Sequence, residues 1–146
     1  MTSRSNARDK PCLETLHHWL EKIPYAMFLG IKAEPSKKDI IFILPKNKKF
    51  IGNPSLPALH GGVIGAFMEQ AAALHLVGSM DAAALPKIIN FSLDYLRPAQ
   101  LRDTYASCIL SRKGRFISNL TITAWQEHIN QPNAIARAHF LTPETN

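Results

Sequence analysis

The sequence has little cysteine and no long apolar run, and these two absences exclude several classes of protein. Cys12 and Cys108 are the only cysteines, and they show neither close spacing nor a metal-ligand pattern. We therefore expect free thiols, no metal site and a reducing cytoplasm. No run approaches the roughly 18 uncharged apolar residues that a bilayer span requires, so we expect no membrane partner. The polar N-terminus, with no apolar segment behind it, predicts no secretory signal.

The composition is that of one ordinary globular domain. Hydrophobic residues make up 46% of the chain and charged residues 19%, and 146 residues can form one core. The net charge of +6 is divided between the first ten residues and a group of lysines from position 46 to 49. A nucleic-acid-binding protein would more often show a basic stripe with exposed aromatics, so we expect no nucleic-acid partner. We predict a flexible tail over residues 1–11 and a single domain over 12–146.

Apolar spacing predicts the elements of the first part of the chain. Apolar residues recur at three and four over residues 13–22, which predicts an amphipathic helix that ends at or just before Pro24. Two strands are expected at 29–34 and 39–44, separated by a Pro-Ser-Lys-Lys turn. Residues 45–59 contain three prolines and one glycine, which predicts a loop.

The second part begins with a helix and continues as strands. Residues 60–80 are apolar nearly all round and too many for one strand, which predicts a helix that is buried on most sides. After Pro86 the spacing changes to two, and it predicts a meander of four strands over 89–95, 104–111, 115–126 and 134–141. A buried helix with strands before and after it requires a sheet that wraps it. We therefore predict an α+β fold with a curled antiparallel sheet around a long central helix.

Glu69 is the first candidate for chemistry. It is the only charged residue between Lys49 and Asp81, and it lies within the apolar helix. A buried carboxylate is costly unless it is paired, and perturbed carboxylates cluster at functional sites. The alternative is that Glu69 lies on the one exposed stripe of the helix, next to Gln70.

The helix begins with His60-Gly61-Gly62, which is the second candidate. Two glycines at a helix start leave backbone N–H groups uncovered, and the helix dipole there favours an oxyanion, although a plain tight turn gives the same pattern. Gly61 and Glu69 are eight residues apart, or about 12 Å along one helix. One carbonyl cannot contact both in a single chain. If both act on one carbonyl, they come from different subunits of an obligate oligomer.

Other motifs give weaker evidence for a catalytic or binding function. The sequence has no G-x-S-x-G elbow and no H-E-x-x-H, and its six histidines lack catalytic or metal spacing. His75, on the apolar helix, is expected to be a core histidine with a hydrogen-bond partner. The stretch Arg112-Lys113-Gly114-Arg115 is either a solvated hairpin turn or a grip for a phosphate.

Two phrases together resemble the PaaI-type hotdog thioesterases. Leu59 begins L-H-G-G-V-I-G-A-F-M-E, in which the acidic residue lies nine positions after the histidine, as in that family. Ile89 begins I-N-F-S-L-D-Y-L-R-P-A, which matches the family's Tyr/Phe-x-x-Pro-Ala phrase at the end of the next strand. The resemblance covers roughly residues 25–142. It implies a hotdog fold and an acyl-CoA thioesterase without a cofactor, in a homodimer or homotetramer with its site between subunits.

The resemblance also implies roles for individual residues. Gly61 matches the backbone amide that polarises the thioester carbonyl, and Glu69 matches the catalytic carboxylate, acting as nucleophile or as general base for water. His60 and Gly62 belong to the same motif beside the substrate. In the family, basic residues near a late turn and the last strand hold CoA. The corresponding candidates here are Arg97, Arg112, Lys113, Arg115, Arg137 and His139.

The sequence departs from the family at two positions. Many members carry an amide side chain six or seven residues before the glycine, which helps to hold the water or thioester. Asn53, the nearest match and therefore the third catalytic candidate, lies eight before Gly61. Many also carry Ser or Thr near the start of the strand after the helix, where this chain has Ile88. Asn90 or Ser92 is the expected substitute. These departures leave the acyl group and the catalytic efficiency open.

Two other functions compete with thioester hydrolysis. A hotdog dehydratase acting on acyl-carrier-protein substrates needs a histidine well before the glycine and a glutamate about five residues after it, where this chain has Ala66. A non-catalytic acyl-CoA-binding protein is the other alternative. A pure binder has no need for a carboxylate such as Glu69 in an apolar tunnel, where its burial is costly.

Overall fold

The computed structural model describes residues 11–80 and 82–144. The predicted flexible tail therefore lies outside the described residues except for Pro11. That proline is buried, and its Cβ lies 3.1 Å from the position that a Cβ on Gly78 would take. The backbone N–H of Cys12 donates to the Gly78 carbonyl (3.1 Å). The domain therefore begins with a close contact to the central helix.

The N-terminal part contains two helices, where one was predicted. The expected helix is confirmed as α1 (Leu13–Leu20), but Pro24 begins a second helix, α2 (Pro24–Leu29), because proline suits the first turn of a helix. Gly30, with φ 75°, ends α2 in the left-handed conformation. The prediction of a strand from residue 29 was therefore wrong at its start. The strand there is β1 (Lys32–Pro35).

The region between β1 and the central helix contains more structure than the predicted loop. Strand β2 (Ile40–Leu44) follows the expected turn and pairs with β1. Within residues 45–59, a short 3-10 helix, η2 (Lys48–Phe50), leads into a small hairpin of β3 (Ile51–Asn53) and β4 (Ala58–Leu59). The prolines in this segment limit the length of these strands but do not prevent them.

The central helix α3 (Gly61–Met80) is confirmed, and it forms the middle of the core. From Leu74 to Met80 every residue is buried, and Phe67 and Met68 are also fully buried. Each such large apolar side chain stabilises the fold by about 1.5–3 kcal/mol relative to its exposed state. The prediction that no apolar run approaches a bilayer span was wrong for α3. Among the described helices, α3 alone has the length and apolar composition to cross a membrane, but most of it is packed inside the domain.

The sheet contains β5 (Ile88–Tyr95), β6 (Thr104–Lys113), β7 (Ile117–Trp125) and β8 (Ala134–Leu141) together with β1 and β2. Its order is β1-β2-β6-β7-β8-β5, with antiparallel neighbours. The predicted four-strand meander was wrong for β5, which pairs with β8 instead of β6. The position beside β6 is not free, because β6 has β2 on one side and β7 on the other, and β5 lies at the edge of the sheet next to β8.

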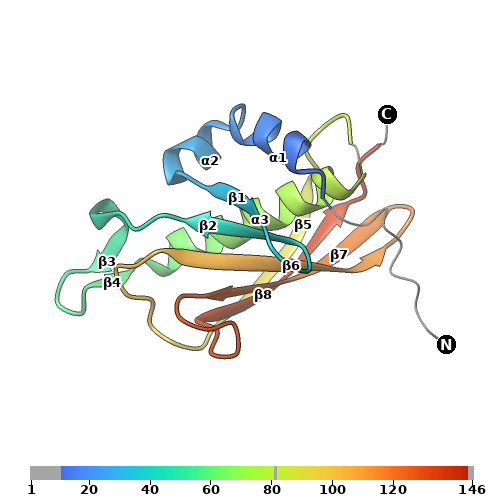
Figure 1. The fold of residues 1–146 in the computed structure, drawn as a ribbon. Coiled ribbons are helices and arrows are strands. Elements are labelled where there is room, and N and C mark those ends of the chain that lie inside the picture. The colour runs from blue at the N-terminus through green and yellow to red at the C-terminus, as the bar shows by residue number, and fades with distance from the viewer. Residues whose placement is uncertain (1–10, 81, 145–146) are drawn as a thin grey trace.

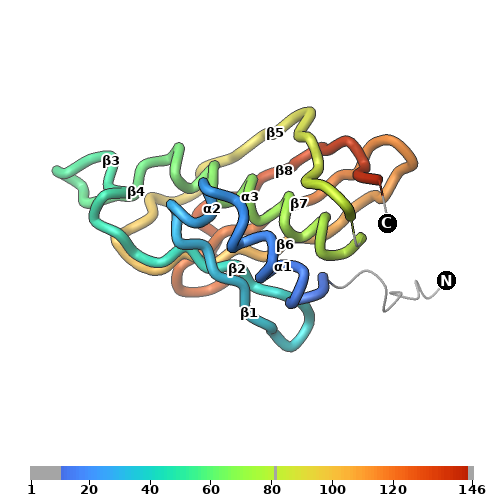
Figure 2. Tube along the Cα trace, turned by 90° about the horizontal axis from the view of Figure 1, so that it is seen from above, coloured from blue at the N-terminus to red at the C-terminus, as the bar shows by residue number. Residues whose placement is uncertain are grey.

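The domain has three layers (Figure 1). The curled sheet lies on one side of α3, and α1 and α2 lie on the other. Seen from above, α1 and α2 lie toward the β1 edge of the sheet, whereas no described helix covers the side of α3 that faces β5 (Figure 2). The edge strand β5 and the adjacent side of α3 are therefore open together.

Candidate active site

The start of α3 is held by the residue before it. The carbonyl oxygen of His60 accepts hydrogen bonds from the N–H groups of Val63 (3.0 Å) and Ile64 (3.3 Å), and the His60 N–H donates to the Phe50 carbonyl (2.8 Å). The N–H of Gly62 donates to Nδ1 of the His60 ring (2.8 Å). His60 thus caps the helix with both its backbone and its side chain.

Glycine is needed around this histidine because the ring lies close to the backbone. A Cβ on Gly62 would lie 2.9 Å from Nδ1 of His60, and a Cβ on Gly52 would lie 2.8 Å from Cα of His60. Contacts this short would force the neighbouring atoms to shift if either glycine were replaced by another residue. The second glycine of the motif therefore serves the cap, and its N–H is already engaged.

The N–H of Gly61 is different, because it has no hydrogen-bond partner among the described residues. It lies at the first position of a 20-residue helix, where the dipole is positive. Its neighbouring carbonyl is bound, since the Tyr95 hydroxyl donates to the Gly61 carbonyl oxygen (2.7 Å). A free amide in a fixed turn at a helix start can stabilise a developing oxyanion.

Glu69 lies two turns further along, on the open stripe of α3. Around it, Val63, Ala66, Gln70 and Ala73 are half-buried, whereas the remaining residues of α3 from Ile64 on are buried. The carboxylate is half-buried and forms no hydrogen bond or ion pair with any described residue. Glu69 therefore lies on the stripe that was the alternative prediction, and this stripe is mostly small or apolar. One turn earlier on the same side of α3, a Cβ on Gly65 would meet Leu93 and Phe91 of β5.

The predicted basic residues divide into separate groups. Arg112, Arg115 and His139 line one cavity of about 510 Å³, together with Asn119 and the 70% exposed Phe116. The Arg115 guanidinium lies 5.1 Å from the centre of the Phe116 ring. Cations beside an exposed aromatic ring suit a ligand with phosphates and a flat ring.

Strand register explains how this cavity forms. Arg112 pairs with Asn119, Asn119 with His139, and His139 with Asn90, which gives one row across the sheet. Asn119 and His139 lie between residues that are buried beneath α3, so this row faces away from α3. The next row on that face contains Arg137 and its partner Ser92. The predicted candidates Asn90, Ser92, Arg112, Arg137 and His139 thus share the outer face of the sheet.

Three other candidates lie elsewhere. Lys113 is exposed on the same hairpin but does not line the cavity. Arg97 lines a second cavity of about 180 Å³, near Arg102 and on the loop after β5. Asn53 is exposed at the end of β3, where its Oδ1 accepts the Ser55 N–H (3.0 Å). A contact of any of these with substrate stays a prediction.

The core contains one buried polar pair away from these groups. His75 is 2% exposed, and its Nε2 lies 3.1 Å from Oδ2 of Asp39, which confirms a core histidine with a partner. Burial raises the pKa of the Cys108 thiol well above its ordinary value, and the charge of Asp39 raises it further. Among residues 11–80 and 82–144, no three His, Cys, Asp or Glu side chains come together as a metal site.

Comparison with known families identifies this arrangement of helix, sheet and glycine turn. The profile described as the thioesterase superfamily matches residues 56–132, a segment that contains the HGG turn, α3, the acidic residue and the strands from β5 to β7. The chain belongs to the thioesterase superfamily. This membership makes the protein a hydrolase of acyl thioesters in general terms, and it confirms the predicted hotdog fold.

Solved structures agree with the family. A protein from Chromobacterium violaceum is 35% identical to this thioesterase-superfamily chain (TM-score 0.73), with 91% of this chain and 93% of that one covered. A phenylacetic acid degradation-related protein from Ralstonia eutropha is 22% identical (TM-score 0.74; 87% and 98% covered). A protein from Streptococcus mutans, bound to acetyl CoA, is 18% identical (TM-score 0.66; 80% and 91% covered). Comparison with curated proteins gave no match.

Sequence reasoning missed the contact that joins β5 to the glycine turn of this superfamily member. Tyr95 belongs to the Y-L-R-P-A phrase used for the resemblance, yet nothing in its sequence position showed that its hydroxyl would bind the Gly61 carbonyl. Phe116 was also missed, because an aromatic residue in a strand usually belongs to the core. Its place just after Arg115 in a hairpin turn was the available signal.

Proposed function

We propose that the protein hydrolyses acyl-CoA thioesters, with the Gly61 amide polarising the carbonyl and Glu69 supplying the catalytic carboxylate. The observation that carries this proposal is the N–H of Gly61 at the positive end of α3, which has no hydrogen-bond partner in the part of the chain that the structure describes. This group is the donor that stabilises the oxyanion of a tetrahedral intermediate. The second half of the proposal is supported by Glu69, which is half-buried and forms no ion pair within residues 11–80 and 82–144.

The distance between these groups supports a site shared by two subunits. Along one α3, Gly61 and Glu69 are eight residues apart, or about 12 Å, which is too far for one carbonyl to contact both. Strand β5 offers the surface for a second copy. Strand β5 lies at the edge of the sheet, and four large apolar residues in it or directly after it are exposed: Ile88, Ile89, Tyr95 and Leu96. An exposed edge of this kind favours pairing with another strand.

Two-fold pairing of β5 would supply the missing geometry. In an antiparallel pair of identical strands, the Tyr95 end of one β5 meets the Ile88 end of the other. Tyr95 contacts Gly61, and Gly65, one turn before Glu69 on α3, lies against Leu93 of β5. The pairing therefore brings the start of one α3 toward the middle of the other, where Glu69 lies. The basic cavity lies on the row of Asn90, so the partner's cavity would approach the same end.

The chemistry follows from these positions. With Glu69 as general base, water loses a proton to the carboxylate as its oxygen attacks the carbonyl carbon, and the carbonyl oxygen becomes an oxyanion bound by the Gly61 N–H. When the oxyanion re-forms the carbonyl, the C–S bond breaks and the proton on Glu69 passes to the departing thiolate. Direct attack by Glu69, followed by hydrolysis of the anhydride, gives the same products.

The cavity of Arg112, Arg115 and His139 supports CoA as the leaving group. CoA carries phosphates and an adenine ring, and the cavity offers two guanidinium groups beside an exposed phenylalanine. The fold supports the assignment too, since the related Streptococcus mutans protein is bound to acetyl CoA. A carrier-protein substrate would present a phosphopantetheine arm to the site, with a single phosphate and no adenine.

Subunit complementation tests the shared site directly. Glu69→Gln removes the carboxylate, and Gly61→Pro removes the amide N–H while keeping a residue that suits the first position of a helix. Each variant alone should be inactive. In a mixed dimer, one of the two sites is intact, because it takes Gly61 from the Glu69→Gln chain and Glu69 from the Gly61→Pro chain. About half of the dimers in an equal mixture are mixed, so co-refolded variants should recover about a quarter of wild-type activity.

The control for this experiment is Gly61→Ala, which adds a Cβ but keeps the N–H. Its Cβ would lie 3.0 Å from the Tyr95 hydroxyl, so it reports the steric effect alone. Failure of the mixture to regain activity, with both variants folded and mixed dimers present, would place the two groups in one chain's site. Binding of acyl-CoA by the wild type without any hydrolysis would instead indicate a non-catalytic acyl-CoA-binding protein.

The CoA assignment has its own matched variants. Arg112→Ala with Arg115→Ala removes both guanidinium groups from the cavity, whereas Lys113→Ala removes a charge from the same hairpin outside the cavity. The double variant should raise KM for acyl-CoA about tenfold or more, from the loss of charge-assisted bonds. The effect should disappear with acyl-pantetheine substrates. Equal effects of Lys113→Ala and the double variant would mean that only net charge matters.

A further inference from the structure

We propose that Tyr95 is a positioning residue for the oxyanion-binding amide: its hydroxyl, through the Gly61 carbonyl, holds the turn that keeps the Gly61 N–H aimed at the substrate. This inference rests on the proposed function of the Gly61 amide. It adds a residue from another element of the fold to the machinery of the helix start. The proposal stands on the hydrogen bonds and close contacts around Gly61.

The hydrogen bonds of the turn leave one amide free and fix those around it. The Gly61–Gly62 peptide is held at both ends, because its carbonyl accepts from Tyr95 (2.7 Å) and its N–H donates to Nδ1 of His60 (2.8 Å). Among the described residues, Tyr95 is the one side chain from outside the turn that bonds to it. The resulting chain runs from the Tyr95 hydroxyl through the peptide to the imidazole, and each bond polarises the next.

Close packing also joins the end of β5 to the start of α3. A Cβ on Gly61 would lie 3.0 Å from the Tyr95 hydroxyl oxygen, and a Cβ on Gly65 would lie 3.3 Å from Cδ2 of Leu93 and 3.8 Å from the same hydroxyl. Gly61 and Gly65 are four residues apart and so share one face of α3. The two glycines thus form a shallow seat on the first turn of α3, against which the end of β5 rests.

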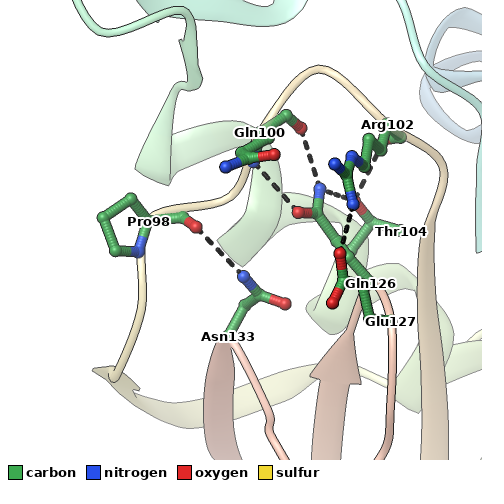
Figure 3. A network of polar contacts seen from close by, with 7 residues as sticks. All are labelled: Pro98, Gln100, Arg102, Thr104, Gln126, Glu127 and Asn133. Carbon is green, nitrogen blue, oxygen red and sulfur yellow. Dashed lines mark hydrogen bonds and ion pairs between the residues drawn. The ribbon is translucent and has the colours of Figure 1, made fainter.

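The loop after β5 holds Tyr95 in place. The N–H groups of Leu96 (2.8 Å) and Arg97 (3.1 Å) both donate to the Asn133 carbonyl, and Nδ2 of Asn133 donates to the Pro98 carbonyl (3.2 Å). Figure 3 shows this contact beside a second group, in which Gln126 joins Gln100 and Thr104. Asn133 is 7% exposed. A phenol at the end of a strand can fix a helix start only if its own backbone is fixed, and this network fixes it.

The functional consequence is preorganisation. A donor stabilises the oxyanion most when it needs no rearrangement as charge develops, and that benefit appears in kcat and not in substrate binding. Loss of the Tyr95 hydroxyl leaves the Gly61 N–H present but less firmly aimed. Because one neutral hydrogen bond is lost and no catalytic group is removed, the expected fall in kcat is about three- to tenfold.

The test compares Tyr95→Phe with Tyr105→Phe. Tyr105 is half-buried in β6, and its hydroxyl has no hydrogen-bond partner among the described residues. We expect Tyr95→Phe to lower kcat about three- to tenfold with KM changed less than about twofold, and Tyr105→Phe to change neither. A purely structural role would lower the melting temperature or raise KM without this split, and such a result would overturn the proposal.

A second measurement separates this inference from the proposed function. In ¹H–¹⁵N spectra of the intact oligomer, Tyr95→Phe should shift the amide resonances of Gly61 and Gly62 and speed hydrogen exchange at Gly62. If the wild type hydrolyses no acyl thioester, the proposed function fails, while these spectra still decide whether Tyr95 positions the turn. Unchanged Gly61 and Gly62 resonances, or a wild-type kcat in an active enzyme, would overturn the role of Tyr95.

Discussion

Replacement of Glu69 by glutamine is the perturbation that most directly tests the proposed chemistry. The carboxylate is half-buried on the open stripe of α3 and has no hydrogen bond or ion pair with any described residue. Glutamine has nearly the same shape, so the change removes charge and basicity without breaking a described contact. We expect the free energy of unfolding to change by less than about 0.5 kcal/mol.

The expected effect on catalysis is much larger than this. Glutamine can neither attack the carbonyl nor take a proton from water, and general base catalysis alone contributes about 10²–10⁴ in rate. We therefore expect kcat to fall by about 10² or more, which corresponds to about 2.7 kcal/mol or more of lost transition-state stabilisation. KM should change far less. A loss of this size at constant stability cannot come from unfolding.

The assay is steady-state release of free thiol from a panel of acyl-CoAs, with thermal unfolding of each variant measured in parallel. Gln70→Ala, on the same stripe of α3, is the matched control and should keep kcat within a few-fold of wild type. Glu69→Asp should retain some activity, because the resembling family uses either acid at this position. A folded Glu69→Gln protein within a few-fold of wild type would falsify the assignment of Glu69 as the catalytic carboxylate.

Three further outcomes are expected. At about pH 8, thiol reagents should modify Cys12 first, because it is exposed and the N–H and hydroxyl of Thr15, in the first turn of α1, favour its thiolate and lower its pKa. Cys108, whose pKa is raised by burial, should react only on unfolding, and equal rates in the folded protein would contradict this. Asp39→Ala should lower the free energy of unfolding by about 1–3 kcal/mol in urea titrations, because it leaves buried His75 without its partner. An unchanged unfolding midpoint would argue against a stabilising Asp39–His75 pair. Ile89→Glu should shift the protein toward monomer in sedimentation experiments, since it adds a charge to the exposed edge strand β5. An unchanged sedimentation coefficient would exclude β5 as the interface.

The central helix and most of the sheet could be predicted because their spacing patterns are long. Residues 60–80 are apolar on nearly all sides, and α3 spans Gly61–Met80; the period of two after Pro86 gave β8 with its observed bounds. The short elements were missed for a physical reason. Helix α2 has only six residues, and β3 and β4 have three and two, so a pattern of spacing has too few repeats to be seen.

The order of the strands could not be read from spacing. A spacing of two indicates that a segment is a strand but not which strand it pairs with. In this sheet β6 lies between β2 and β7, and β5 lies beside β8. For the candidate site, the sequence indicated Gly61 by the pair of glycines at a helix start and Glu69 as the one charged residue in an apolar helix, and their roles stay predictions. The pattern could not separate the basic residues that line the cavity from those that do not, because whether Arg112 or Lys113 lines it depends on strand register.

If the site is shared as proposed, α3 serves two sites at once. Its first turn supplies the Gly61 amide to one site, and its middle supplies Glu69 to the other, about 12 Å away. Any tilt of the helix would then move a donor in one site and a carboxylate in the other, so the helix must be held rigidly at its start and along its length. The structure meets both needs, because Tyr95 and His60 bind the first turn and the residues from Leu74 to Met80 are buried. Rigidity of α3 is therefore a catalytic requirement as well as a source of stability, and variation in acyl specificity is expected outside this helix, in the parts of the fold that can change without moving it.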